Sequence, residues 1–182
     1  MADLAVTMKA PLGWAKRMPG WVWLYGVIGA VFAVITLLIL QANPEVEPHF
    51  CLSLAPLLAA PTIVQVHVSA ALTAFMVGLV LLLSPKGLRI HKTLGWIWVS
   101  AMALTAGSSF FMTGLMGNMY SPIHALSAWT ALGLPFGIAA IRKGDVKAHR
   151  QRMTGMYLGG MVIAGMFAFL PGRLLWSVFF AA

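Results

Sequence analysis

The sequence predicts an all-α integral membrane protein with five transmembrane helices, and three observations support this class. Of its 182 residues, 60% are hydrophobic and only 9% are charged, which excludes a soluble domain with an ordinary polar surface. Five segments, 21–41, 61–83, 93–116, 123–141 and 153 to about 170, approach or exceed the roughly 20 apolar residues that a membrane-crossing helix needs, and none contains Asp, Glu, Lys or Arg. Short segments of strict apolar alternation, which are typical of membrane barrels, are absent, so helices remain as the spanning structure.

The first two elements in chain order are an interfacial segment and a single crossing. Residues 1–20 mix apolar and basic residues around Pro11, and we expect them to lie in the headgroup layer. The first transmembrane helix is predicted over residues 21–41. This apolar run is long for a signal peptide and no small-x-small cleavage motif ends it, so we expect the helix to be retained.

The rest of the chain, residues 61–176, is predicted to form a four-helix transmembrane bundle built from a duplicated helix pair. In each pair, a histidine lies near the start of the first helix. The turn to the second helix contains Lys-Gly, and a second histidine, followed directly by Lys or Arg, comes four or five residues after that glycine. Because spans two and four run the same way, as do three and five, the repeat axis lies along the membrane normal. The helices are expected over 61–83, 93–116, 123–141 and 146–170, and the repeated residues are His67 with Lys86-Gly87 and His91-Lys92, and His124 with Lys143-Gly144 and His149-Arg150.

The basic residues predict the orientation of the chain in the membrane. Short loops rich in Lys and Arg stay in the cytoplasm, and a cytoplasmic N-terminus puts eleven of the twelve Lys and Arg residues on the inner side. Only Arg173 falls outside. The net charge of +8 is then explained by topology and by attraction to anionic lipids, so we expect membrane lipids as partners and no nucleic acid. The expected location is the cell (inner) membrane, with a multi-pass topology.

Four histidines are the candidate functional residues. The predicted topology puts His67 and His124 near the outer face and His91 and His149 near the inner face, one on each of four successive helices. Ionisable residues inside a membrane are costly and usually face the bundle interior, where they bind something or pair with each other. We therefore expect two cross-helix pairs, His67 with His124 and His91 with His149.

Paired imidazoles on facing helices favour a b-type haem, one or two per chain, with the four histidines as axial ligands of the iron. The haem propionates need cations, and Arg89, Lys92, Arg150 and Arg152 lie beside the inner pair. The outer pair has only the distant Arg173, so propionates there would need water or hydroxyls. Small residues that offer room for the flat ring, or equally a close helix contact, are Gly78, Ala106-Gly107-Ser108, Gly133, Gly155, Gly159-Gly160 and Gly165.

A second interpretation needs no cofactor. A histidine beside Lys or Arg at a helix start also reaches to lipid headgroups or bonds to a neighbouring helix. The chain would then be an accessory or lipid-binding subunit of a larger membrane complex, whose basic inner turns hold anionic headgroups. In the same conservative sense, Glu45, Glu47, His49 and Cys51 are interpreted as a polar outer loop rather than as metal ligands. The methionines of the last span are interpreted as packing residues.

Signatures of soluble catalysis are missing from the sequence. There is no Gly-x-x-x-x-Gly-Lys, Gly-x-Ser-x-Gly, Cys-x-x-Cys or His-Glu-x-x-His, and no acidic residue lies in a predicted span to serve a transporter. Whether the chain is an enzyme stays open beyond possible electron transfer. A quinol or a redox protein is the partner expected for such a role.

Three segments of the bundle carry a resemblance to a known family. They resemble small bacterial predicted multi-pass membrane proteins of unknown function, over about residues 60–170. One histidine on each of four successive helices, paired second with fourth and third with fifth, is also similar to cytochrome b561, whose members pass electrons across membranes between two haems. That resemblance implies haem and electron transport, although five spans and very short loops depart from it. The segments are His67-Val-Ser-Ala-Ala-Leu through Ser84-Pro85-Lys86-Gly87, His91-Lys92-Thr93-Leu94-Gly95, and Lys143 to Met153 with its His-Arg-x-x-Met element.

Overall fold

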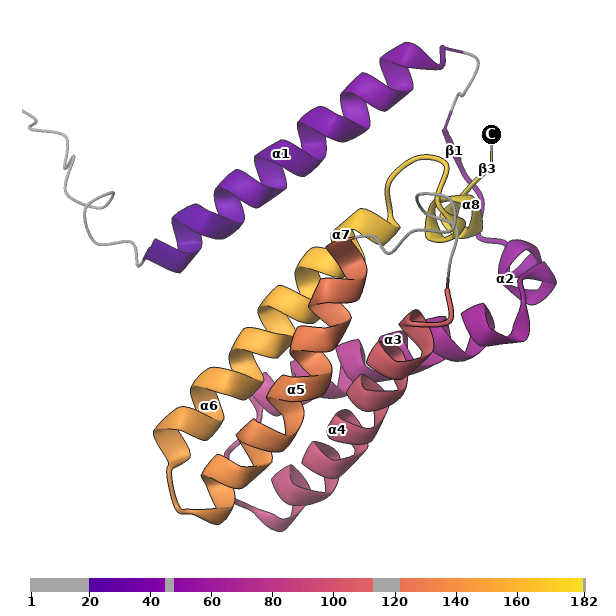
Figure 1. Cartoon of the computed structure of the whole chain (residues 1–182). Coiled ribbons are helices and arrows are strands. Elements are labelled where there is room, and N and C mark those ends of the chain that lie inside the picture. Colours follow the sequence, from indigo (N-terminus) through magenta and orange to yellow (C-terminus); the bar gives the residue numbers. More distant parts are fainter. Residues whose placement is uncertain (1–19, 45–47, 113–121, 182) are drawn as a thin grey trace, which may run out of the picture. The chain divides into compact units, whose positions relative to one another are not determined.

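The computed structural model describes residues 20–44, 48–112 and 122–181, and nearly all of its elements are helices (Figure 1). It divides into two units, Met1–Ala42 and Asn43–Ala182, and each is described by itself. The predicted interfacial segment 1–20 lies outside the described residues except for Gly20. The elements are α1 (Gly20–Ala42), β1 (His49–Phe50), α2 (Ala55–Ala59), α3 (Thr62–Leu83), α4 (Arg89–Ser109), α5 (Pro122–Arg142), α6 (Val146–Gly155), the π-helix η2 (Met156–Ile163), α7 (Ala164–Ala168), α8 (Leu174–Phe179) and β3 (Phe180–Ala181).

Among the described residues, three helices are long and apolar enough to cross a membrane, which agrees with an all-α membrane protein. They are Tyr25–Ala42 within α1, Thr62–Leu83, and His124–Arg142 within α5. The third and fifth predicted crossings are less clear-cut. α4 begins with a basic first turn that contains Arg89 and Lys92, and the last helical run is divided among α6, η2 and α7.

The first unit contributes one described element, α1, whose surface is apolar. Val27, Val31 and Leu38 are exposed along it. Its hydroxyl residue Thr36 donates to the carbonyl of Phe32 at 2.9 Å, so this polar group is satisfied within the helix. A helix with an apolar surface and internally bonded polar groups is suited to surrounding lipid.

In the second unit, α3, α4, α5 and the α6–η2–α7 run pack side by side as a bundle (Figure 1). α4 packs against both α3 and α5, and η2 contacts α3 and α5. The α3–α4 and α5–α6 turns lie at the same end of this bundle (Figure 1). Gly87 and Gly144 in these turns have φ angles of +85° and +80°, a left-handed conformation that glycine adopts without steric cost. The two Lys-Gly turns therefore match in conformation as well as in sequence.

The two turns differ in how the helices beside them are capped. Asp145 is the N-cap of α6 and accepts a hydrogen bond from the Ala148 N–H at 2.9 Å. Ser84 is the C-cap of α3, and α4 begins after Leu88 without a side-chain cap. The left-handed residue Gly87 completes the turn, so the helix cannot start before it.

The middle of the bundle is filled by large side chains. Trp98 and Met102 from α4 and Met156, Tyr157 and Met161 from η2 are buried together. The Tyr157 ring stacks on Phe75 of α3 with centroids 6.0 Å apart, and its hydroxyl donates to the Phe75 carbonyl at 3.1 Å. Side chains from three helical segments thus meet at one level.

Several glycines expected to leave room for a haem ring are instead packing sites. A Cβ added to Gly78 would collide with the Tyr157 ring and lie 2.7 Å from Nε1 of Trp98. A Cβ on Gly133 would lie 2.8 Å from the sulfur of Met156. At these two positions the second expectation, a close helix contact, holds, because neighbouring side chains already occupy the space. Open space around an added Cβ is found at Gly107, Gly155 and Gly165.

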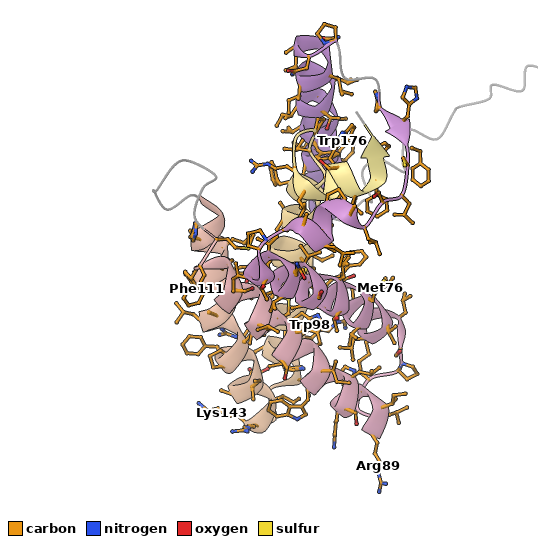
Figure 2. All side chains as sticks on the ribbon, turned by 90° about the vertical axis from the view of Figure 1, so that its right-hand side faces the viewer. Met76, Arg89, Trp98, Phe111, Lys143 and Trp176 are labelled. Atoms are coloured by element: carbon orange, nitrogen blue, oxygen red, sulfur yellow. The ribbon has the colours of Figure 1, made fainter. Side chains whose placement is uncertain are left out.

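The opposite end of the bundle from the basic turns carries a small sheet and two short helices. β1 pairs with β3 in antiparallel fashion, with His49 opposite Ala181 and Phe50 opposite Phe180. Figure 2 shows Trp176 of α8 at this end, and Arg89 and Lys143 at the other. The two ends therefore differ in chemistry, one being aromatic and the other basic.

Candidate functional site

We call the end of the bundle that holds His67 and His124 the outer level, and the end with the basic turns, His91 and His149 the inner level. His67 lies on α3, and α4 orients its ring. His67 Nδ1 lies 3.0 Å from the Ser108 hydroxyl, and that hydroxyl donates its own proton to the Thr105 carbonyl at 3.1 Å. The Ser108 hydroxyl can accept a hydrogen bond from His67 Nδ1–H while it donates to Thr105. In that tautomer neutral His67 has its lone pair on Nε2, where a metal or a hydrogen-bond donor can bind.

The second outer histidine, His124, lies on α5 beside the end of α4. It is only 5% exposed, and its ring centroid is 6.3 Å from that of Phe110. One turn further along α5, Ser127 accepts a hydrogen bond from Ser109 at 2.6 Å. The last turn of α4 thus contacts His67 on one side and the His124 turn on the other.

At the inner level, the ring of His149 is also oriented by a hydrogen bond to a neighbouring helix. His149 Nδ1 on α6 lies 2.9 Å from the carbonyl oxygen of Gly137 on α5. Since a carbonyl can only accept, Nδ1 carries the hydrogen and neutral His149 also has its lone pair on Nε2. His67 has the same tautomer as His149 when Ser108 accepts its Nδ1–H bond, and the two rings lie at opposite ends of the bundle.

The other inner histidine, His91, lies in the first turn of α4. Its Nδ1 is enclosed by protein and has no hydrogen-bond partner among the described residues. His91 follows the first basic turn, and His149 follows the second.

Positive charge surrounds this inner level. Asp145 is the only acidic residue in the described part of the chain, and its carboxylate is used as the cap of α6. The Arg152 guanidinium lies over the Phe136 ring, 5.7 Å from its centroid, while Arg89 and Lys143 mark the same end in Figure 2. Also in these two turns are the predicted propionate partners Lys92 and Arg150.

Metal sites with three or more protein ligands are not found among the described residues. His49 and Cys51 of the outer segment are both exposed and form no such cluster, and Glu45 and Glu47 lie outside the described residues. A haem iron needs only two protein ligands, because the macrocycle supplies the others.

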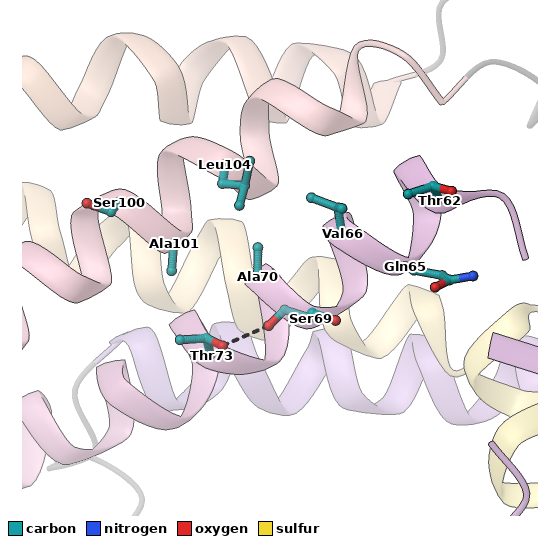
Figure 3. Close-up of a pocket in the computed structure, with 9 residues that line it drawn as sticks. All are labelled: Thr62, Gln65, Val66, Ser69, Ala70, Thr73, Ser100, Ala101 and Leu104. Carbon is teal, nitrogen blue, oxygen red and sulfur yellow. Dashed lines mark hydrogen bonds between the residues drawn. The ribbon is translucent and has the colours of Figure 1, made fainter. Parts of the chain in front are cut away.

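A groove of about 550 Å³ lies between α3 and α4 near the outer level (Figure 3). Ala70 and Ala101 form its most buried part, and hydroxyl and amide side chains stand along it. Thr73 donates to the Ser69 carbonyl at 2.8 Å, as the dashed line in Figure 3 marks. The lining residues are Thr62, Gln65, Val66, Ser69, Ala70, Thr73, Ser100, Ala101 and Leu104.

Comparison with known proteins places this bundle in a family. Residues 64–179 match the family described as Predicted membrane protein (DUF2306). The chain belongs to this family. The matched region of this DUF2306 member runs from α3 to the end of α8 and contains all four candidate histidines. Its description gives a membrane protein and no activity, as the resemblance in the sequence implied. No curated protein and no solved structure matches the chain.

Sequence reasoning missed the groups that orient the imidazoles. Ser108 was noted only for its small size, although its spacing of three from Thr105 allows the hydroxyl to bond back to that carbonyl. The Gly137 carbonyl has no side-chain signal at all. An orienting hydroxyl can be suspected from sequence, whereas an orienting backbone oxygen requires the fold.

Proposed function

We propose that this DUF2306 member is a five-span membrane protein that binds haem b at two levels and carries electrons. The observation that supports this best is the matched orientation of His67 and His149. His149 donates Nδ1–H to a carbonyl, and the Ser108 hydroxyl can accept the same bond from His67, which leaves Nε2 of each ring available, as in metal-bound histidines.

The five-span topology rests on helix length and on the repeated turns. The 21 residues of α4 extend about 31 Å at 1.5 Å per residue, which matches the hydrocarbon thickness. α6, η2 and α7 follow one another without a break from residue 146 to residue 168. With the basic turns in the cytoplasm, the N-terminus is inside and the protein belongs to the inner membrane.

The residues present fit a haem at each end of the bundle. His67 and His124 are the proposed outer ligands, and His91 and His149 are the proposed inner ligands. The enclosed Nδ1 of His91, which lacks a protein partner, is the kind of atom that a bound group or water satisfies. Arg89, Lys92, Arg150 and Arg152 would hold the propionates of the inner haem.

The packed middle separates the two proposed sites. Trp98, Met102 and Tyr157 fill the interior between the histidine levels, so a ring can only lie towards either end. Along α4, the rise from His91 to Ser108, the partner of His67, is about 26 Å. The haem supplies one-electron chemistry, while the protein orients the imidazoles and excludes water from them.

The proposed electron donor is a lipid-soluble quinol, and a redox protein is the proposed acceptor. The groove between α3 and α4 supports the quinol because its lining is uncharged and combines hydroxyls with apolar side chains. Val66 and Ala70 of this groove lie on either side of His67 in α3. A quinol head in the groove would therefore lie beside the outer level.

A second candidate is a cofactor-free subunit of a larger complex that binds anionic lipid through its inner end. The observation that favours it is the uncompensated charge of the two Lys-Gly turns, where Asp145 is the only described acid. The packed middle agrees equally well with this role. In that case the histidines join helices and hold no iron.

Electron paramagnetic resonance of the oxidised, purified protein separates the two candidates. Two axial imidazoles give a low-spin ferric haem, and we expect His124→Ala to abolish the low-spin signal of the outer haem. His49→Ala is the matched control, because His49 is exposed and lies outside the bundle. A protein from haem-supplied cells with no ferric haem signal would leave the cofactor-free candidate.

A further inference from the structure

Two segments far apart in the sequence form one small structure at the end of the bundle opposite the basic turns. We call residues 48–60 and 174–181 the outer cap. β1 and β3 pair within it, and the sheet is extended by hydrogen bonds from the Cys51 N–H to Phe179 O at 3.0 Å and from the Ser53 N–H to Val178 O at 2.9 Å. α2 packs against α8, and Val178 of α8 is buried.

The surface of the outer cap is apolar and uncharged. Phe50, Leu52, Leu54 and Leu58 are 74%, 63%, 58% and 69% exposed. No Asp, Glu, Lys or Arg occurs in either segment. Adjacent large apolar side chains exposed in this way mark an interaction surface rather than a face that water covers.

The backbone of the outer cap is satisfied from within the protein. Gln65 on α3 donates from Nε2 to the carbonyls of Leu58 and Ala60, at 3.0 and 2.8 Å. Together with the strand pairing, these bonds remove polar backbone groups that would otherwise need water. Such internal satisfaction is what a segment requires before it can enter a low-dielectric layer.

Aromatic side chains gather in the same place. The Phe50 and Phe180 rings meet edge to face with centroids 6.2 Å apart. The ring centroids of Trp176 and Phe180 are 4.3 Å apart. Trp and other aromatic residues are enriched at the level of the lipid headgroups. Val66 and Leu72 of α3, the helix that Gln65 joins to the cap, are exposed as well.

We infer that the outer cap is immersed in the membrane, with Phe50, Leu52, Leu54 and Leu58 inserted among the lipids of the leaflet opposite the basic turns. The partner is thus the lipid surface itself, and the segment is not a loop in water. Continuity with the lipid-facing side of α3 favours lipid over a second protein copy. The inference is independent of haem binding.

The single cysteine of the chain provides the test. Cys51 is exposed and lies next to Phe50, so a nitroxide attached to it in the full-length protein, reconstituted in phospholipid vesicles, reports the depth of the cap. We expect its collision rate with oxygen, relative to a water-soluble nickel complex, to be several-fold above that of Lys143→Cys. Leu72→Cys, which is exposed on α3, is the lipid-facing reference. Both controls carry Cys51→Ser.

Two results would overturn the inference. A Cys51 ratio equal to that of Lys143→Cys would place the cap in water. A nitroxide shielded from both reagents, with dipolar broadening that disappears on dilution with unlabelled chain, would show that a second copy covers it. A label at Leu58→Cys in the Cys51→Ser background checks each reading from another residue of the cap.

Discussion

The middle of the bundle and its two ends are built from different residues. In the middle, Trp98, Met156 and Tyr157 press against glycines and leave no space. At the ends, histidines are held by Ser108 or by the Gly137 carbonyl, in surroundings that are polar or basic. The difference teaches that a glycine in a membrane helix can mark close packing, as at Gly78 and Gly133, rather than room for a ligand.

The largest expected effect is the loss of one proposed site at a time. If the two ends hold separate haems, a redox titration of the wild type shows two waves, His149→Ala removes the inner wave and His67→Ala removes the outer wave. Each change deletes one axial ligand and leaves the packed middle untouched. Loss of both waves in either variant, with an unchanged helical circular dichroism spectrum, would show that the ends are not independent.

A change in the middle should affect stability rather than cofactor content. Gly78→Ala brings a Cβ against Tyr157 and Trp98, and overpacking of this kind costs about 1–3 kcal/mol. Thermal unfolding in detergent, followed by circular dichroism, measures the loss. Gly107→Ala is the matched control, because nothing lies within 4 Å of its added Cβ. Equal stability of the two variants would contradict the packed interior.

Removal of the orienting hydroxyl should weaken the outer site alone. Ser108→Ala takes away the acceptor of His67 Nδ1–H, and the loss of such an outer-shell partner reduces metal affinity by about tenfold or more. Haem retention at the two levels, followed by redox titration after dilution, measures the effect. Ser100→Ala, in the same helix but remote from His67, is the control. If the Ser108→Ala variant kept its outer haem after dilution as well as the wild type does, the Ser108 hydrogen bond would not contribute to haem affinity.

The smallest expected effect concerns the charges at the inner end. Reduction adds an electron, and nearby cations stabilise the reduced form, so the inner haem should have the higher midpoint potential. Arg150→Gln together with Lys92→Gln should lower the inner potential by an amount on the order of 50 mV, while the outer potential stays constant. A shift of both waves by the same amount would mean that the charges act on the whole protein.

Most helix positions follow from the sequence, because apolar runs end at prolines and basic turns. α1, α3 and α5 begin and end next to the limits expected from those runs. α4 begins earlier than residue 93, since a helix continues into its charged first turn once Gly87 has completed the bend. Charge excludes residues from an apolar run but does not exclude them from a helix.

The site was only partly accessible from the sequence. The four histidines stood out because ionisable residues are rare in apolar segments. The π-helical turns of η2 could not be foreseen, because they accompany the packing of Tyr157 over Gly78, a contact between residues far apart in the chain. The Gly137 carbonyl was equally hidden, because any residue has a carbonyl.

The central claim, that each end of the bundle holds one haem, is tested most directly by the ratio of haem to protein in chain purified from haem-supplied cells. We expect two haems per chain in the wild type and in His49→Ala, and none in the double variant His67→Ala with His149→Ala. A well-folded wild-type protein without haem would contradict the claim, as would a double variant that retains both haems.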